Sequence, residues 1–120
     1  MGENIITTKT YQLSVDVVFT YKKLKSKYKE PDLFKQLLRS GTSISANVRE
    51  ARSAESDKDF IHKLSISRKE TNETIFWLDL LKDTLYLEKE LYDKLIIQAN
   101  QILKILTSII LTTMKKLDLL

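Results

Sequence analysis

The 120-residue sequence contains no cysteine, one proline and two glycines. The absence of cysteine excludes disulfides, zinc–thiolate sites and cysteine nucleophiles, and it is compatible with a reducing cytosol. The scarcity of proline and glycine leaves few turn residues, which favours a few long helices over many short strands. A chain of this length is expected to form one domain with a single core.

Histidine is almost as scarce, because His62 is the only one in the chain. A di-iron site in a helical bundle needs two Glu-x-x-His motifs, so we expect neither a metal nor a cofactor. Ser40, Ser43, Ser45 and Asn47 have no activating base in view, so we predict that they make core hydrogen bonds and that the protein is not an enzyme.

The pair Glu70 and Glu73 has the spacing of two carboxylates on one helix face and could serve acid–base chemistry. Arginines and lysines lie close to this pair in the sequence, and Arg39 lies on the preceding predicted helix. We therefore interpret the two carboxylates as members of a structural ion-pair network.

No uninterrupted apolar run reaches the roughly 18 residues of a membrane-spanning helix, and the first residues lack the apolar core of a signal peptide. We therefore expect a cytoplasmic protein without membrane contact. Twenty Lys and Arg against sixteen Asp and Glu give a net charge of +4 and a pI near 9.2. This excess permits binding to nucleic acid or another anionic partner without requiring it.

Apolar residues recur every three or four positions along four segments, which predicts helices over about 9–28, 31–53, 57–85 and 88–116. Residues 1–8 are predicted to be a flexible N-terminal arm, and residues 9–120 a single domain. Short connections between four helices predict an all-α fold, an antiparallel up-down-up-down four-helix bundle. In the first helix, the core stripe is expected to be widened by Tyr11, Val15, Val18 and Phe19. The third helix is expected to carry its stripe to Leu85, and the fourth to turn Ile109 inward.

The second predicted helix passes through Gly41 without losing its apolar register, so we expect it to be continuous although a mid-helix glycine costs about 1 kcal/mol. Inward positions in the middle of the second and third helices are small or hydroxylic: Gly41, Ser67, Thr71 and Thr74. This pattern predicts two closely crossing helices with a small polar layer between apolar layers. Ser56 is predicted to cap the third helix, with Asp59 as its reciprocal partner.

Two surfaces are candidates for function. The first is a cluster at the end of the first helix, where lysines could contact phosphates and tyrosines could stack on bases: Lys22, Lys23, Lys25, Lys27, Lys29, Tyr21 and Tyr28. A solvated helix end is the alternative interpretation. The second is surplus apolar surface on the last two helices, which indicates a subunit contact: Phe76, Trp77, Leu80, Leu103 and Ile110.

A second basic group is expected at the opposite end of the bundle, where it competes with four carboxylates. Its members are Arg49, Arg52, Lys58, Lys115 and Lys116, and the carboxylates are Glu50, Glu55, Asp57 and Asp59. Because charges of both signs are mixed there, the lysine cluster of the first helix is the better candidate for an anion-binding surface.

Three motifs give the chain a resemblance to a known family: RSGTSISANVREA at 39–51, AESDKDFIHKL at 54–64 and KETNETIFWLDLL at 69–81. Together they resemble bacterial four-helix-bundle proteins encoded in intervening sequences of 23S ribosomal RNA genes. That family includes the accessory variability determinants of diversity-generating retroelements. The resemblance extends from about Tyr11 to Lys116, and it implies an antiparallel bundle that assembles as a homopentamer.

These observations favour a non-enzymatic oligomeric binding module. It would engage nucleic acid, or a nucleic-acid-handling protein such as a reverse transcriptase, through a basic surface repeated by symmetry. The alternative is an oligomeric scaffold that binds a protein partner and has no nucleic-acid contact.

Overall fold

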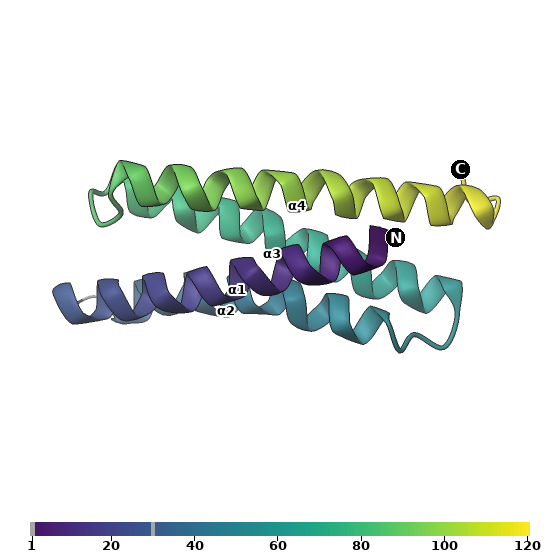
Figure 1. Ribbon diagram of the computed structural model, residues 1–120, viewed down its shortest axis with the longest axis horizontal. Coiled ribbons are helices and arrows are strands. Elements are labelled where there is room, and N and C mark those ends of the chain that lie inside the picture. The colour runs from purple at the N-terminus through teal and green to yellow at the C-terminus, as the bar shows by residue number, and fades with distance from the viewer. Residues whose placement is uncertain (1, 30) are drawn as a thin grey trace.

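The computed structural model describes the backbone of residues 2–29 and 31–120 and the side chains of residues 5–29 and 32–120. These residues form four helices and no strand: α1 (Gly2–Lys27), α2 (Pro31–Ala51), α3 (Asp57–Asp83) and α4 (Lys89–Lys116). The principal extents of 49 × 21 × 21 Å fit helices arranged two by two in cross-section (Figure 1).

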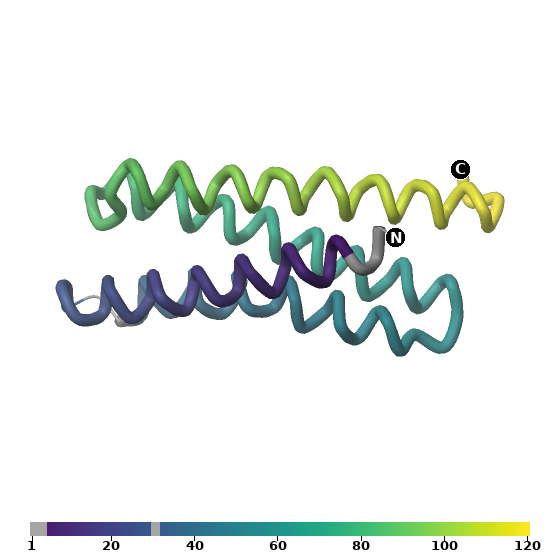
Figure 2. Tube along the Cα trace, in the orientation of Figure 1, coloured from purple at the N-terminus to yellow at the C-terminus, as the bar shows by residue number. Residues whose placement is uncertain are grey.

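Each helix packs against the next one in the chain, and α1 also packs against α4, so the four helices close into a ring. Consecutive helices run in opposite directions along the long axis, as the colour gradient of Figure 2 shows. The backbones of α1 and α3 stay further apart than those of adjacent helices, so within the described residues these two helices are diagonal neighbours. This arrangement confirms the predicted all-α, up-down-up-down four-helix bundle.

The core is built from the stripes that the helical periodicity predicts. In α2, every inward apolar position from Phe34 to Ala51 is buried, and in α3 the stripe from Leu64 to Leu81 is buried. Burying these side chains is the main favourable term for the fold, because each contributes about 1.5 to 3 kcal/mol of transfer free energy.

A layer of hydroxyl groups, which we call the hydroxyl layer, lies between the apolar ends of the bundle. Its members are buried: Ser14, Ser40, Ser45, Ser67, Thr71 and Thr74. The Ser14 and Ser45 hydroxyls lie 2.7 Å apart, and the Thr74 and Ser40 hydroxyls lie 3.0 Å apart. The Ser67 hydroxyl donates to the Ile44 carbonyl at 2.8 Å. The predicted polar layer is confirmed, and it extends further than predicted because α1 also joins it through Ser14.

The prediction of core hydrogen bonds in the central α2 motif is confirmed for the buried Ser40 and Ser45, whereas Ser43 and Asn47 are only partly buried and bond within their own helix. Ser43 and Asn47 donate to the carbonyls of Arg39 and Ser43, each at 2.8 Å. Both bonds stay within α2 and satisfy these side chains locally. Together with the pairs formed by Ser40 and Ser45, they account for all four polar residues that the sequence assigned to hydrogen bonding.

Helix α2 is continuous through Gly41, as predicted. The absence of a side chain at Gly41 leaves room for the neighbouring helix α1. A Cβ at Gly41 would lie 2.9 Å from both Cγ atoms of Val17, which is fully buried. The Ser14 hydroxyl donates to the Gly41 carbonyl at 3.1 Å across the same contact. The glycine therefore permits a close approach of two helix backbones.

The predicted N-cap of α3 is confirmed, because the Ser56 hydroxyl accepts from the Asp59 amide at 3.0 Å. The carboxylate of Asp59 in turn accepts from the Glu55 amide at 3.2 Å. The usual capping box returns to the amide of the cap residue itself, so here the return bond is displaced by one residue.

The end of α3 differs from the prediction, which placed Leu85 in the core. The helix ends at Asp83, and Leu85 has φ 69° and is 85% exposed. The Tyr86 amide donates to the Leu81 carbonyl at 2.9 Å and the Leu85 amide to the Lys82 carbonyl at 3.0 Å, which is a Schellman termination. The left-handed backbone turns Leu85 outward, and Leu87 is the next buried residue.

The start of the chain also differs from the prediction of a flexible arm over residues 1–8. Helix α1 begins at Gly2, and Ile6 is 2% exposed within the core. Ile6 lies one heptad before Leu13, so the apolar stripe continues into the segment that the sequence reading assigned to the arm. Met1 lies outside the described residues.

Helix α4 turns Ile110 into the core at 1% exposure, whereas Ile109 is only half-buried. The prediction of Ile110 as an interface residue is therefore wrong. A straight helix drifts by about 20° per heptad against a strict seven-residue pattern. After Leu106, the next inward position is four residues on, at Ile110, instead of three.

By length and composition, α4 could also cross a membrane, although interrupting polar residues hide this from a search for unbroken apolar runs. Core helices of folded bundles pass the same test, and α4 buries five residues in the bundle: Leu95, Ala99, Ile102, Leu106 and Ile110. A single helix of this kind is weak evidence for a membrane.

Candidate nucleic-acid interface

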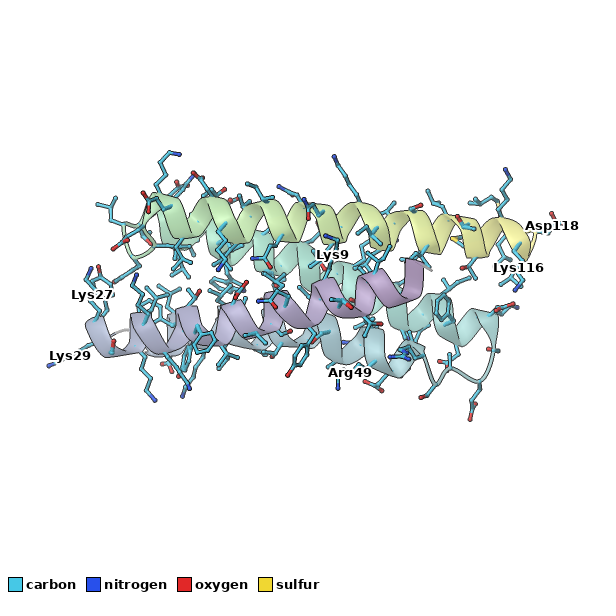
Figure 3. The ribbon with its side chains drawn as sticks, in the orientation of Figure 1. Lys9, Lys27, Lys29, Arg49, Lys116 and Asp118 are labelled. Carbon is cyan, nitrogen blue, oxygen red and sulfur yellow. The ribbon has the colours of Figure 1, made fainter. Side chains whose placement is uncertain are left out.

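The lysine cluster occupies the last two turns of α1 and the residues that follow. All five lysines are exposed: Lys22, Lys23, Lys25, Lys27 and Lys29. Figure 3 shows Lys27 and Lys29 at one end of the bundle, with Lys29 projecting away from the helices. The cluster thus forms a charged rim at the end opposite Lys116 and Asp118.

None of these five lysines forms an ion pair with any other residue that the structure describes. Lys25 and Lys27 lie over the rings of Tyr21 and Tyr28, with the ammonium nitrogens 5.8 and 5.3 Å from the ring centroids. A cation over a ring keeps its full charge. At the same end, Lys89 pairs with Asp93 at 2.7 Å. The cluster differs from such a pair because no carboxylate among the described residues neutralises its charge.

The two tyrosines of the cluster are packed against the core, not displayed. Tyr28 makes edge-to-face contacts with Phe34 and Tyr86, with ring centroids 6.3 and 5.0 Å apart. The Tyr28 ring, which the sequence predicts to stack on bases, is therefore covered by these aromatic contacts and by Lys27. The structure brings Tyr21 and Tyr28 to the cluster as supports for Lys25 and Lys27.

The exposed aromatic side chain beside the cluster is Phe19, which is 65% exposed. Sequence reasoning placed Phe19, Tyr11, Val15 and Val18 on the inner stripe of α1. In the structure, that stripe runs through Ile6, Leu13, Val17 and Leu24, and Phe19 points away from it. The helical spacing indicates this orientation. Phe19 lies two residues after Val17, which places the two side chains about 160° apart around the helix axis, and Val17 points inward.

One member of the second basic group is ion-paired, and carboxylates lie among the other members. Lys116 pairs with Asp57 at 3.5 Å, and the guanidinium of Arg49 lies 5.0 Å from the ring centroid of Tyr11. An open cleft of about 450 Å³ lies at this end, and its charged lining residues are of both signs: Arg52, Glu55, Asp57 and Lys116. Figure 3 shows Lys116 and Asp118 at this end and Arg49 nearer the middle. Mixed charge makes it a weaker anion site than the lysine cluster.

The predicted interface residues of α3 form an exposed aromatic face. Phe76 is 55% exposed and stacks edge-to-face on Trp77, with ring centroids 4.9 Å apart. The Trp77 indole nitrogen donates to the Glu73 carboxylate at 3.4 Å. Leu80 and Leu103 are half-buried. Of the five predicted residues, only Ile110 is removed from the surface by the bundle itself.

Glu70 and Glu73 are brought together with Arg39 across the contact between α2 and α3. Arg39 bonds to the Glu73 carboxylate, and its other terminal nitrogen lies 3.6 Å from the Glu70 carboxylate. The Glu70 Oε1 atom is buried without a hydrogen-bond partner among the described residues. This arrangement is the ion-pair network that the sequence predicted. His62 is exposed, and no three metal-ligating side chains converge within the described chain.

Near the lysine cluster, the α3–α4 contact is held by Tyr92, whose hydroxyl donates to the Asp79 carboxylate at 2.6 Å. This hydrogen bond to Asp79 is the main cause that raises the pKa of Tyr92 from 10.0 to about 12. The Nζ atom of Lys82 lies 4.3 Å from the centroid of the Tyr92 ring. The polar groups of this contact are thus already engaged with one another.

With this geometry established, the chain can be compared with known proteins. Residues 2–108 match the family described as 23S rRNA-intervening sequence protein. The chain belongs to that family. A crystal structure of a protein of unknown function from the S23 ribosomal protein family of Bacteroides thetaiotaomicron VPI-5482 is 46% identical, with a TM-score of 0.89. The similarity covers 92% of this chain and 98% of that chain. No match is found among curated proteins.

For this member of the 23S rRNA-intervening sequence protein family, the comparisons agree with the motifs that first suggested the family. The match to the solved structure spans nearly the whole bundle, so all four helices are shared features. The descriptions name no enzymatic activity, and the solved relative is described as having unknown function. Function must therefore be argued from the surfaces of this chain.

Proposed function

We propose that this protein is a non-enzymatic binding module whose lysine cluster engages the phosphate backbone of nucleic acid. The observation that carries the proposal is that five exposed lysines lie together without an ion-pair partner in the described chain. A phosphate backbone binds such a cluster by releasing condensed counterions, without requiring a preformed pocket. The protein's net charge of +4 acts in the same direction.

We further propose that the module is cytoplasmic and acts as a homo-oligomer, with the pentamer implied by the family resemblance. Phe76 and Trp77 support an interface on α3, because a surface aromatic pair of this kind is typical of protein contacts. Five copies would carry a net charge of 5 × 4 = +20 and repeat the lysine cluster around one rim. Repetition converts weak contacts into useful affinity when one strand can reach several copies.

The test is fluorescence anisotropy of labelled RNA and DNA from low to physiological salt, with molecular mass measured by light scattering. In the test variant, the five cluster lysines become glutamine. In the matched control, five exposed lysines elsewhere that form no ion pair among the described residues become glutamine: Lys9, Lys58, Lys69, Lys104 and Lys115. Both variants have a net charge of 4 − 5 = −1, so they differ only in where charge is removed.

The expected result is salt-sensitive binding by the wild type, a loss of at least tenfold in the cluster variant and a smaller loss in the control. Equal losses in the two variants would show that only net charge matters and would contradict the assigned surface. A wild-type oligomer that binds neither RNA nor DNA at low salt would contradict nucleic-acid binding altogether.

A second candidate function is a scaffold for a protein partner, such as a reverse transcriptase, without nucleic-acid contact. The observation in its favour is the exposed side chain of Phe76, which stacks on Trp77. Both residues lie on α3, the helix diagonal to α1. Binding of such a partner would change little with salt, and Phe76→Ala would weaken it while the lysine variant would not.

A further inference from the structure

Phe19 lies between two shallow hollows on the outside of the bundle. One hollow, of about 210 Å³, lies between α1 and α4 and is lined by Asp16, Phe19, Thr20, Lys23, Leu91 and Lys94. The other, of about 250 Å³, lies along α1 and is lined by Tyr11, Ser14, Val15, Val18, Phe19 and Lys22. The ring is thus a projecting apolar plate with space on both sides.

Positive charge flanks the ring on both sides. Lys22 stands at the hollow along α1, and Lys23 and Lys94 stand at the hollow between α1 and α4. Lys22 and Lys23 belong to the lysine cluster, so the plate is continuous with the proposed phosphate-binding surface. Lys94 adds a charge from α4 that the sequence reading did not connect with the cluster.

One carboxylate, Asp16, also lies in the hollow between the helices, but its side chain is only 12% exposed. Its two oxygens accept hydrogen bonds from Gln12 at 3.2 Å and Gln98 at 3.0 Å, and Lys94 lies 3.8 Å away. These three groups screen the carboxylate, so it opposes an approaching phosphate less than a free carboxylate would.

We infer that Phe19 is a stacking residue for an unpaired base of single-stranded nucleic acid, with Lys22 on one side and Lys23 and Lys94 on the other contacting the flanking phosphates. An aromatic plate between cations fits the way single strands are held, because each base has an exposed face and each phosphate a charge. A duplex offers phosphates but hides its base faces. The inference rests on the proposed function and adds the class of nucleic acid.

The surface of α1 also gives a reason to choose a nucleic acid over a second copy of the chain. A contact between copies would bury Lys22 and Lys23 beside the ring, and burying cations that have no ion-pair partner is costly. A single strand carries one negatively charged phosphate per base, so phosphates lie on both sides of a stacked base and can contact these lysines. Phe76 on α3 is also exposed and has no assigned nucleic-acid contact, so it serves as the comparison residue.

The test measures anisotropy of one labelled RNA sequence, single-stranded and as a duplex, with wild type, Phe19→Ala, Phe19→Tyr, Phe76→Ala and the five-lysine variant. Phe19→Ala should weaken single-strand binding by about 5- to 150-fold, the range for loss of one stacked base. Its duplex affinity should stay within about twofold, because the phosphate contacts are intact. Phe19→Tyr should retain single-strand binding. Phe76→Ala should change the single-strand and duplex affinities by the same factor, because the proposed subunit interface acts on both through the number of copies.

Three results would overturn the inference while leaving the proposed function standing, provided that the five-lysine variant still loses binding. The first is an unchanged single-strand affinity in Phe19→Ala, and the second is an equal loss for single strand and duplex. The third is a fall in the mass of Phe19→Ala by light scattering, which would assign the ring to a contact between copies. Failure of the wild type to bind either form would overturn both proposals.

Discussion

The hydroxyl layer and the lysine cluster differ in how their polar groups are partnered. In the hydroxyl layer, buried side chains such as Thr74 and Ser67 each reach a partner within 3.0 Å. In the cluster, five exposed ammonium groups have no ion-pair partner among the described residues. A buried polar group needs a hydrogen-bond partner inside the protein, whereas an exposed polar group is solvated by water until it binds a ligand.

This difference separates structural from functional polarity in one small protein. Removing a group from the hydroxyl layer should reduce stability, because it leaves another group unpaired or a helix displaced. Removing charge from the lysine cluster should change binding and leave the fold nearly unchanged, since exposed charges contribute little to stability.

Gly41→Val should have the largest effect on stability. The new Cβ would fall 2.9 Å from the Cγ atoms of the buried Val17, whose β-branched side chain cannot rotate away freely. Overpacking of this kind costs about 1 to 3 kcal/mol. Denaturant unfolding at fixed protein concentration measures the loss, because any assembly makes apparent stability depend on concentration.

The control for this prediction is Ala46→Val, which places the same valine side chain at an exposed position of α2. It should cost no more than about 0.7 kcal/mol, the range of helix propensity. Adding Val17→Ala to Gly41→Val should recover part of the lost stability. If Gly41→Val and Ala46→Val lose equal amounts, the close approach of α1 and α2 at Gly41 is wrong.

Thr74→Val should have a smaller effect of about 1 to 2 kcal/mol. It keeps the shape of the side chain but removes the hydroxyl that lies 3.0 Å from the Ser40 hydroxyl. Ser40 is then left with a 3.4 Å bond to the Leu37 carbonyl, and an inadequately paired buried hydroxyl costs free energy. Unfolding of the single variant and of Thr74→Val with Ser40→Ala measures the pair.

The double variant should be nearly as stable as Ser40→Ala alone, because replacing both partners removes the unpaired group. Strict additivity of the two losses would mean that the hydroxyls do not interact. The lysine cluster provides the opposite control: its glutamine variant should show no such coupling with Thr74→Val.

Asp79→Ala should have the smallest effect on stability, because Asp79 and Tyr92 are both partly exposed and solvent screens their contact. The hydrogen bond to Asp79 raises the pKa of Tyr92 to about 12 from 10.0. Because the folded-state pKa is the higher one, the contact's stabilisation is fully present below about pH 10 and is lost as the pH rises through about 12. Asp79→Ala should return the pKa of Tyr92 toward 10.0.

Ultraviolet absorbance titration of the tyrosines follows this change, and Tyr92→Phe identifies which of the five tyrosines contributes the late step. An unchanged late step in Asp79→Ala would contradict the assignment of the shift to that carboxylate. A late step that persists in Tyr92→Phe would assign it to another ring.

Much of the bundle was predictable because inward positions recur with the period of the helix. The continuity of α2 through Gly41 and the cap at Ser56 follow from local spacing and side-chain chemistry, and both are confirmed. The start of α1 was missed because Ile6 is separated from Leu13 by polar residues, so its burial depends on packing against other helices. Ile110 was misassigned because a strict heptad count ignores the drift of a straight helix.

The candidate site was predictable only as a set of charges. The sequence locates the lysines. Phe19, Tyr21 and Tyr28 lie in or just after the last turns of α1, and the sequence does not reveal which of these rings other side chains cover. Packing against Phe34 and Tyr86 fixes Tyr28 in the interior, while Phe19 stays 65% exposed. The aromatic residue that is available for a ligand is therefore the one that the sequence reading assigned to the core.

The sequence by itself determined that the chain forms helices, where most of them begin and end, and which side of α2 and α3 is buried. These properties depend on residues three or four positions apart, so they are encoded locally. Only the tertiary structure decided which neighbour Gly41 admits, which lysines remain unpaired and which aromatic rings are exposed. Those outcomes depend on contacts between residues far apart in the chain, and no local pattern specifies them.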